Sequence, residues 1–157
     1  MKIVDGDLIT LAKQGRFDVI VHGCNCFNTM DNGIAAMIKQ YFPEAYEADR
    51  QTVPGDRCKL GSLSAAKVER DGVVFTVINA YTQFDQFGDG NADYEAIQMV
   101  FAQIRQEFHG QRIGYPLICA GGGGGNWSVI EKIIEQELAD EDYTLVRYPA
   151  SPEHIMA

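Results

Sequence analysis

Short β-branched runs alternate along the chain with segments of helical periodicity, and this alternation is the strongest constraint on the fold. The clearest buried runs are Val-Ile-Val at residues 19–21 and Val-Val-Phe-Thr-Val-Ile-Asn-Ala at residues 73–80. Residues 34–42 and 92–109 carry apolar side chains at helical spacing, and a proline and a glycine follow them. Strands that alternate with helices favour a largely parallel or mixed sheet covered on both faces. The pattern therefore predicts an α/β fold.

The weaker elements continue the same alternation. Expected strands cover residues 2–4, 18–22, 59–68, 73–80, 113–119 and 143–148. Expected helices cover residues 8–15, 34–42, 44–51, 92–109 and 127–138. Either Asn126 or Ser128 is placed to cap the last helix. A chain of 157 residues is long enough for one domain, which we expect over residues 1–148, with a C-terminal tail over residues 149–157.

The charge balance of the chain is acidic. Lys and Arg number 13 against 22 Asp and Glu, which gives a net charge of −9. Binding to a nucleic-acid backbone needs a basic stripe, so we expect no direct nucleic-acid partner. No stretch has the length of a membrane span, and no basic segment precedes an apolar run. We therefore expect a cytoplasmic protein with no membrane segment and no signal peptide, and we expect it to be a monomer.

The cysteines do not form a metal-binding pattern. Cys24 and Cys26 are separated by one residue, whereas a zinc site normally has two or more residues between its cysteines and a second matching pair. Cys58 and Cys119 stand alone. All four lie in or near apolar runs, where a free thiol behaves as a small buried hydrophobe. We expect buried, reduced thiols, no metal site and no cofactor.

Two strand–loop–helix passages carry the chemistry. One reads DVIVHGCNCFNTMDNGIAAMI, and the other, YPLICAGGGGGNWSVIEKII, contains five consecutive glycines. Each loop leaves the carboxyl end of a predicted strand, which is the edge of an α/β sheet where ligands bind. Glycines allow a close approach of the backbone, so that successive N–H groups and the next helix dipole can hold a phosphate. The alternative is a surface loop with no ligand.

On these residues the chain resembles the macro domains, most closely the branch of ADP-ribose 1''-phosphate phosphatases (Appr-1''-p processing). The matching segments are Gly6-Asp7-Leu8-Ile9, His22-Gly23-Cys24-Asn25-Cys26, Asn32-Gly33-Ile34-Ala35, Tyr41 with Pro43, Pro116 and Trp127. The resemblance covers about residues 1–148. It implies a three-layer α/β/α domain with a central mixed, largely parallel sheet of about six strands.

The resemblance also implies which residues bind ADP-ribose. Asp7 accepts the adenine amino group beside the Leu8 backbone, and Asn25 contacts the distal ribose, which Tyr81 flanks. The residues implied for the diphosphate are Asn32, Gly33, Ile34 and Ala35 in the first loop and Gly121, Gly122, Gly123, Gly124 and Gly125, with Asn126, in the second. The residue types leave other roles open: Asp7 can cap a helix, Asn25 can brace a turn and Tyr81 can pack in the core.

His22 and Asp85 are the candidate catalytic side chains, together with Asn25. His22 stands at the mouth of the expected cleft, where histidine can transfer a proton or stabilise charge, but a core role is equally open. An acid to orient His22 or to activate water could come from Asp85, Asp89 or Asp93, and we select Asp85. A solvated loop carboxylate is the alternative for each of them.

The activity implied by the resemblance is metal-independent hydrolysis of ADP-ribose 1''-phosphate to ADP-ribose and phosphate. A non-catalytic ADP-ribose-binding module and a hydrolase that removes ADP-ribosyl groups from a macromolecule are the alternatives. The chain departs from two patterns of de-ADP-ribosylating macro domains: Ala35 replaces a loop aspartate, and residues 79–83 contain no lysine. These departures put those two mechanisms in doubt.

Overall fold

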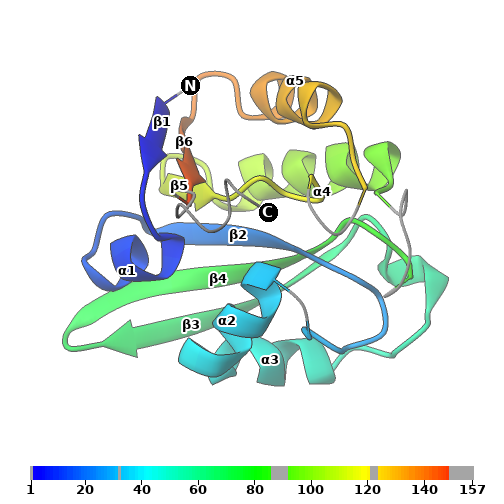
Figure 1. Cartoon of the computed structure of the whole chain (residues 1–157), viewed down its shortest axis with the longest axis horizontal. Helices are drawn as coiled ribbons and strands as arrows, with labels where there is room; N and C mark the ends of the chain where they lie inside the picture. The colour runs from blue at the N-terminus through cyan, green and yellow to red at the C-terminus, as the bar shows by residue number, and fades with distance from the viewer. Residues whose placement is uncertain (1, 32, 86–91, 121–123, 149–157) are drawn as a thin grey trace, which may run out of the picture.

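The computed structural model describes residues 2–31, 33–85, 92–120 and 124–148, and its centre is a mixed six-stranded sheet (Figure 1). The strands are β1 (Lys2–Asp5), β2 (Val19–Cys24), β3 (Leu63–Arg70), β4 (Val73–Tyr81), β5 (Arg112–Tyr115) and β6 (Asp142–Arg147). Their order in the sheet is β1-β6-β5-β2-β4-β3. All neighbouring pairs are parallel except β3 and β4, which are antiparallel. The predicted mixed, largely parallel sheet is confirmed.

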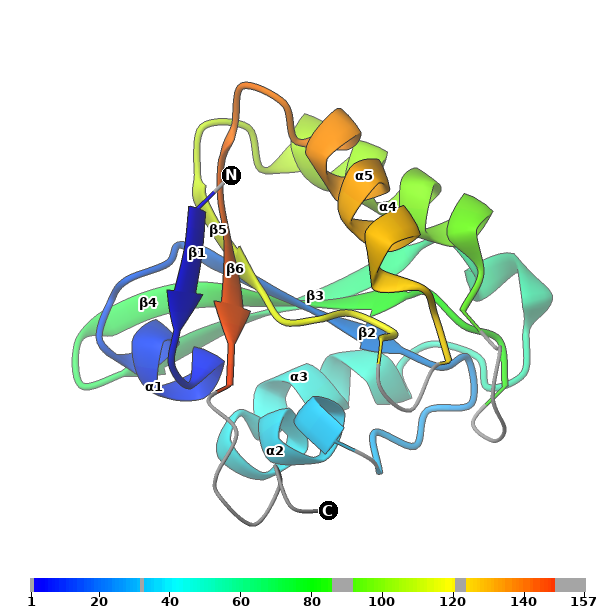
Figure 2. The same cartoon turned by 45° about the horizontal axis from the view of Figure 1, so that its top comes forward.

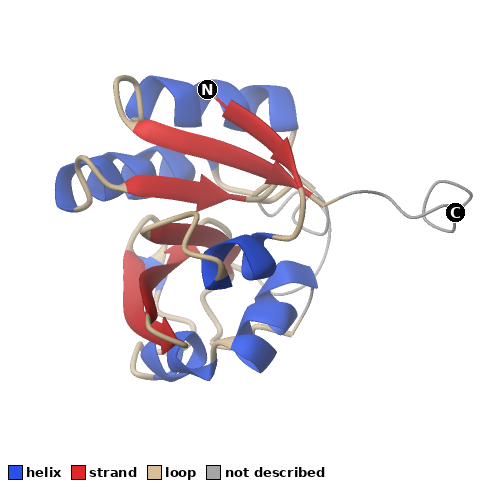
Figure 3. Ribbon diagram, turned by 90° about the vertical axis from the view of Figure 1, so that its left-hand side faces the viewer, coloured by secondary structure: helices blue, strands red, loops and turns tan. Residues whose placement is uncertain are grey.

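Helices cover both faces of this sheet (Figures 2 and 3). The helices are α1 (Leu8–Lys13), α2 (Gly33–Tyr41), α3 (Pro43–Arg50), α4 (Tyr94–Glu107) and α5 (Trp127–Glu137), with a 3₁₀ turn η1 (Arg57–Lys59). The first three pack on one face, and α4 and α5 pack on the other. The predicted three-layer α/β/α arrangement is therefore confirmed. No helix among the described residues is long and apolar enough to cross a membrane.

Two hydrophobic cores meet across β2. Ile20 belongs to the core beneath α1, α2 and α3, whereas Val19 and Val21 belong to the core beneath α4 and α5. Successive side chains of a strand point to opposite faces of the sheet, so a strand in the middle layer needs apolar residues on both sides. All three side chains are fully buried. The uninterrupted apolar run in the sequence is explained by this double burial.

The strand predicted over residues 113–119 is wrong in its second half. β5 ends at Tyr115, and the chain then turns, with the amide of Ile118 donating to the carbonyl oxygen of Pro116 at 2.8 Å. Cys119 has a φ of 57°, which is incompatible with a strand. Pro116 has no N–H to continue the ladder, which favours the early end of β5.

Three smaller expectations also need correction. The strand predicted from residue 59 begins at Leu63, because η1 occupies the preceding residues. Pro43 does more than follow α2, since it begins α3, where the missing N–H of proline costs no helical hydrogen bond. Cys58 is exposed, whereas Cys24 and Cys26 are buried as expected, and all four thiols are free.

We predict that Gly114→Ala destabilises the fold. A Cβ on Gly114 in β5 would lie 2.7 Å from two ring carbons of the buried Phe17. Overpacking of this kind should lower the free energy of unfolding by about 1–3 kcal/mol, measured by chemical denaturation. Gly6→Ala is the control, because the nearest atom to its Cβ is in the Leu11 side chain at 3.3 Å. Equal losses in both variants would contradict the prediction.

Candidate functional site

A cavity of about 810 Å³ lies where the parallel strands end. Residues directly after β1, β2, β4 and β5, residues at the end of β6, and parts of α2 and α3 form its wall. The described wall residues are Gly6, Asp7, Leu8, Gly23, Cys24, Asn25, Met30, Asp31, Gly33, Ile34, Ala35, Met37, Asp49, Gln83, Pro116, Leu117, Cys119, Ala120, Val146 and Tyr148. Both passages that the sequence singled out therefore contribute to one site, at the edge where α/β sheets bind ligands.

The N-terminus of α2 lies in the wall of this cavity. Gly33, Ile34 and Ala35 form its first turn, and Gly33 has a φ of 57°, which favours glycine. The first N–H groups of a helix have no partner within the helix, and the helix dipole places partial positive charge there. The wall can therefore hold an anion through backbone donors. The predicted neighbour Asn32 lies outside the described residues.

Charged side chains give the cavity no net attraction for anions. The described wall contains Asp7, Asp31 and Asp49, and it contains no Lys or Arg. Lys39 is nearby, with its Nζ 3.6 Å from Asp31 Oδ1. An anion in this cavity would consequently depend on backbone N–H groups.

Asp7 lies in the wall and also caps α1. Its Oδ1 accepts a hydrogen bond from the Ile9 amide at 3.1 Å, and its Oδ2 accepts one from the Thr10 hydroxyl at 3.0 Å. A carboxylate oxygen can accept more than one hydrogen bond, so the cap leaves capacity for a ligand donor. The neighbouring Leu8 is buried and also lines the cavity.

Asn25 lies in the wall, where it braces the loop after β2. Its Oδ1 accepts a hydrogen bond from the Phe27 amide at 2.8 Å, and its Nδ2 donates one to the Thr29 hydroxyl at 2.8 Å. The turn-bracing role that the sequence left open is therefore present. Contact with a ligand remains a prediction for this residue.

The described end of the glycine run has a structural role. A Cβ on Gly125 would lie 2.8 Å from the carbonyl oxygen of Cys119, whose hydrogen-bond partner at 2.7 Å is the Gly125 amide. Gly124 has a φ of 69°, and Asn126 caps α5 by accepting from the Ser128 amide. None of Gly124, Gly125 and Asn126 lines the cavity among the described residues. Gly121, Gly122 and Gly123 lie outside the described residues.

His22 lies in the core rather than in the cavity wall. It is fully buried, its Nε2 is 2.6 Å from Asn79 Oδ1, and the Cys24 Sγ is 3.6 Å from the same nitrogen. Burial lowers the pKa of His22 to about 4, although the Asn79 hydrogen bond opposes this change. His22 is therefore neutral near pH 7. This geometry favours the core role that the sequence left open.

The structure does not bring Asp85 to His22. Asp85 is exposed, it does not line the cavity, and its backbone oxygen accepts from Gln83 Nε2 at 3.1 Å. Among the described residues, the hydrogen-bond partners of His22 are Asn79 and Cys24. Asp93 caps α4 by accepting from the Ala96 amide, and Asp89 lies outside the described residues.

Tyr81 is buried beneath the cavity and is not part of its described wall. Its hydroxyl donates to Asp49 Oδ1 at 2.7 Å and lies 2.8 Å from the Ser64 hydroxyl oxygen. Burial raises the pKa of Tyr81, which keeps the phenol neutral. The packing role left open for Tyr81 is the one that the structure supports.

Asp49 is a wall residue that the sequence did not single out. It lies on α3 and is 1% exposed. Burial raises the pKa of its carboxyl group, although the hydrogen bond from Tyr81 and the charge of Lys59 oppose this change. Its residue type does not suggest a wall position, because an acid in a charged helix is usually solvated. The signal that could have found it is its helical spacing from Ala45, which is buried. No cluster of His, Cys, Asp or Glu within the described ranges could hold a metal ion.

We predict that His22 makes the stability of the protein sensitive to acid. The unfolded chain binds a proton at His22 near pH 6.5, whereas the folded chain does so only near pH 4. Stability from neutral His22 is therefore complete above pH 6.5 and falls by about 3 kcal/mol as the pH drops to 4. We expect the difference in free energy of unfolding between wild type and His22→Gln to shrink over this range. A constant difference in denaturation at each pH would contradict the assignment.

Comparison with known proteins identifies a relative and a fold. An uncharacterized 17.5 kDa protein from the tk-vs intergenic region of Enterobacteria phage T4 is 37% identical over 141 residues, which cover 86% of this chain and 88% of the phage protein. No protein-family model matches the chain.

Two solved structures share the fold at lower identity. The macrodomain of Thermus aquaticus DarG has a TM-score of 0.72 at 21% identity, over 94% of this chain and 97% of that one. Thermosipho africanus DarTG in complex with ADP-ribose has a TM-score of 0.73 at 16% identity, over 98% of this chain and 44% of that one. The resemblance to macro domains is confirmed for the fold, and the phosphatase branch stays a prediction. The chain belongs to the family of the 17.5 kDa phage T4 protein and has the macrodomain fold.

Proposed function

We propose that the cavity binds ADP-ribose or a close derivative. The observation that carries this proposal is the position of the α2 N-terminus in the wall of a cavity at the carboxyl edge of the sheet. This arrangement offers backbone donors to a diphosphate without any basic side chain. The likeness in fold to Thermosipho africanus DarTG, solved with ADP-ribose, supports the same ligand class.

The size and lining of the cavity fit such a ligand. A volume of about 810 Å³ lies within the range of roughly 300–1,000 Å³ that is typical of small-molecule pockets. Apolar side chains such as Leu8, Ile34 and Val146 can cover a base, while Asp7 offers an acceptor for its amino group. In this placement Gly33 to Ala35 face the diphosphate and Asn25 lies at the distal ribose.

We predict that Asp7→Ala weakens ADP-ribose binding about 10-fold or more, because a hydrogen bond to a charged acceptor is lost. The measurement is calorimetric titration with ADP-ribose. The same substitution also removes the cap of α1, which costs about 1 kcal/mol of stability.

Asp93→Ala is the matched control for this titration. It removes the cap of α4 in the same way but leaves the described wall of the cavity intact. We expect it to bind ADP-ribose with wild-type affinity. Absence of binding by the wild type would overturn the proposal. An equal loss of ADP-ribose affinity in both variants would contradict a direct contact between Asp7 and the ligand.

A second, finer proposal is hydrolysis of ADP-ribose 1''-phosphate to ADP-ribose and phosphate. Water would attack the phosphorus, the bond from phosphorus to the 1'' oxygen would break, and that oxygen would take a proton. Asp49 favours this chemistry, because it is a buried carboxyl group in the wall whose pKa burial raises. His22, which the sequence analysis selected for proton transfer, is fully buried and does not line the described wall of the cavity.

We predict that a phosphate-release assay with ADP-ribose 1''-phosphate detects turnover that Asp49→Asn lowers about 100-fold, since general acid catalysis contributes roughly 10²–10⁴-fold. His22→Gln should retain most of the turnover, because its side chain does not line the cavity. Binding of ADP-ribose without phosphate release would instead favour the non-catalytic module. Release of ADP-ribose from a modified macromolecule would favour the remaining alternative.

A further inference from the structure

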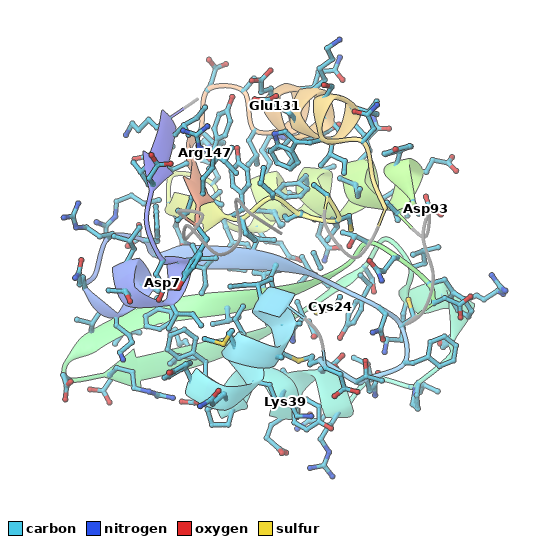
Figure 4. All side chains as sticks on the ribbon, in the orientation of Figure 1. Asp7, Cys24, Lys39, Asp93, Glu131 and Arg147 are labelled. Carbon is cyan, nitrogen blue, oxygen red and sulfur yellow. The ribbon has the colours of Figure 1, made fainter. Side chains whose placement is uncertain are left out.

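The cavity has two chemically different ends. Near β1 and β6 the wall contains the apolar side chains of Leu8 and Val146, with Tyr148, which is 73% exposed, at the rim. Near β2 and β4 the wall contains the polar side chains of Asn25 and Gln83. In Figure 4, α2 lies between the labelled Asp7, at the first end, and Cys24, at the second. The end with Leu8 and Val146 suits a purine ring, and the end with Asn25 and Gln83 suits a sugar.

We infer that Asp49, at the polar end, is a specificity-determining residue that accepts a hydrogen bond from a hydroxyl group of the distal ribose. This inference rests on the proposed binding of ADP-ribose and adds a contact that separates ADP-ribose from ADP. Its basis is the placement of the two carboxylate oxygens of Asp49.

One oxygen of Asp49 is held by the protein. Oδ1 accepts the Tyr81 hydroxyl at 2.7 Å, and that hydroxyl is 2.8 Å from the Ser64 hydroxyl oxygen. Ser64 in turn accepts from Asn79 Nδ2 at 3.0 Å, and Asn79 also bonds to His22. These groups, which are buried except for the half-buried Ser64, fix the orientation of the carboxylate before any ligand arrives, and such preorganisation favours affinity.

The other oxygen of Asp49, Oδ2, is the one that remains for a ligand. It has no hydrogen-bond donor among the described residues. No fully enclosed side-chain nitrogen or oxygen of the described residues lacks a partner, so this oxygen is not sealed inside the protein. Because Asp49 lines the cavity and is otherwise buried, the cavity is the space that this oxygen reaches.

A neutral hydroxyl group is the ligand donor that fits this oxygen. The Lys59 ammonium group, which packs 4.6 Å from the centre of the Tyr81 ring, is already hydrogen-bonded to Asn28 and to the carbonyl oxygen of Cys26. The diphosphate is placed at the N-terminus of α2, where backbone N–H groups can hold it, and not beside this carboxylate. Burial raises the pKa of Asp49, which reflects the loss of water around the carboxylate. A sugar hydroxyl would replace that lost hydrogen bonding.

The test is calorimetric titration of wild type, Asp49→Ala and Asp49→Asn with two ligands, ADP-ribose and ADP. ADP lacks the distal ribose and retains the adenosine and the diphosphate. We expect Asp49→Ala to lower the affinity for ADP-ribose about 10-fold or more and to leave that for ADP unchanged. Asp49→Asn, which keeps the acceptor for the Tyr81 hydroxyl, should also reduce the preference for ADP-ribose. Glu47→Gln, on the exposed side of the same helix, is the control and should change neither affinity.

The outcomes separate this inference from the proposed function. Unchanged ADP-ribose affinity in both Asp49 variants, or equal losses for ADP and ADP-ribose, would overturn the ribose contact while leaving the cavity as the binding site. A wild type that binds neither ligand would overturn the proposed function and the contact together. Binding of ADP at wild-type affinity demonstrates that a variant is folded. If Asp49→Ala does not fold, the isosteric Asp49→Asn decides between these outcomes.

Discussion

The parallel direction of β1, β6, β5, β2 and β4 is the constraint on which the site depends. Parallel strands bring their carboxyl ends to one edge, so the loops that follow them meet although they are far apart in the chain. Asp7, Asn25 and Cys119 reach the same cavity for this reason. The antiparallel β3 is the edge strand of the sheet opposite β1, and it contributes no residue to the described wall.

A largely buried polar network beneath the cavity links the sheet to α3. It runs from His22 through Asn79, Ser64 and Tyr81 to Asp49. Buried polar groups are costly without partners, and each member of this chain satisfies the next. Asn79 also donates to the carbonyl oxygen of Ala45, so these hydrogen bonds hold α3 against β4. The same contacts that stabilise this layer therefore orient the carboxylate in the cavity wall.

The acidic character of the chain is compatible with the proposed anionic ligand, because backbone groups would form the anion site. The first turn of α2 supplies N–H donors, and their number does not depend on the net charge of −9. The close approach of Gly125 to the Cys119 carbonyl oxygen shapes the opposite loop, where a side chain would collide with the backbone. Glycine in both loops thus serves the geometry of the backbone.

The sequence by itself determined the α/β class, most of the helices and strands, and the two loops that contribute to the cavity. These features are local, because periodicity, glycine and proline act over a few residues. The sequence also left open two roles each for His22, Asn25 and Tyr81. Only the tertiary structure decided that His22 and Tyr81 lie in the core and that Asp49 lies in the wall. The burial of Asp49 depends on how α3 packs on β3 and β4, and such long-range contacts leave no local pattern in the sequence.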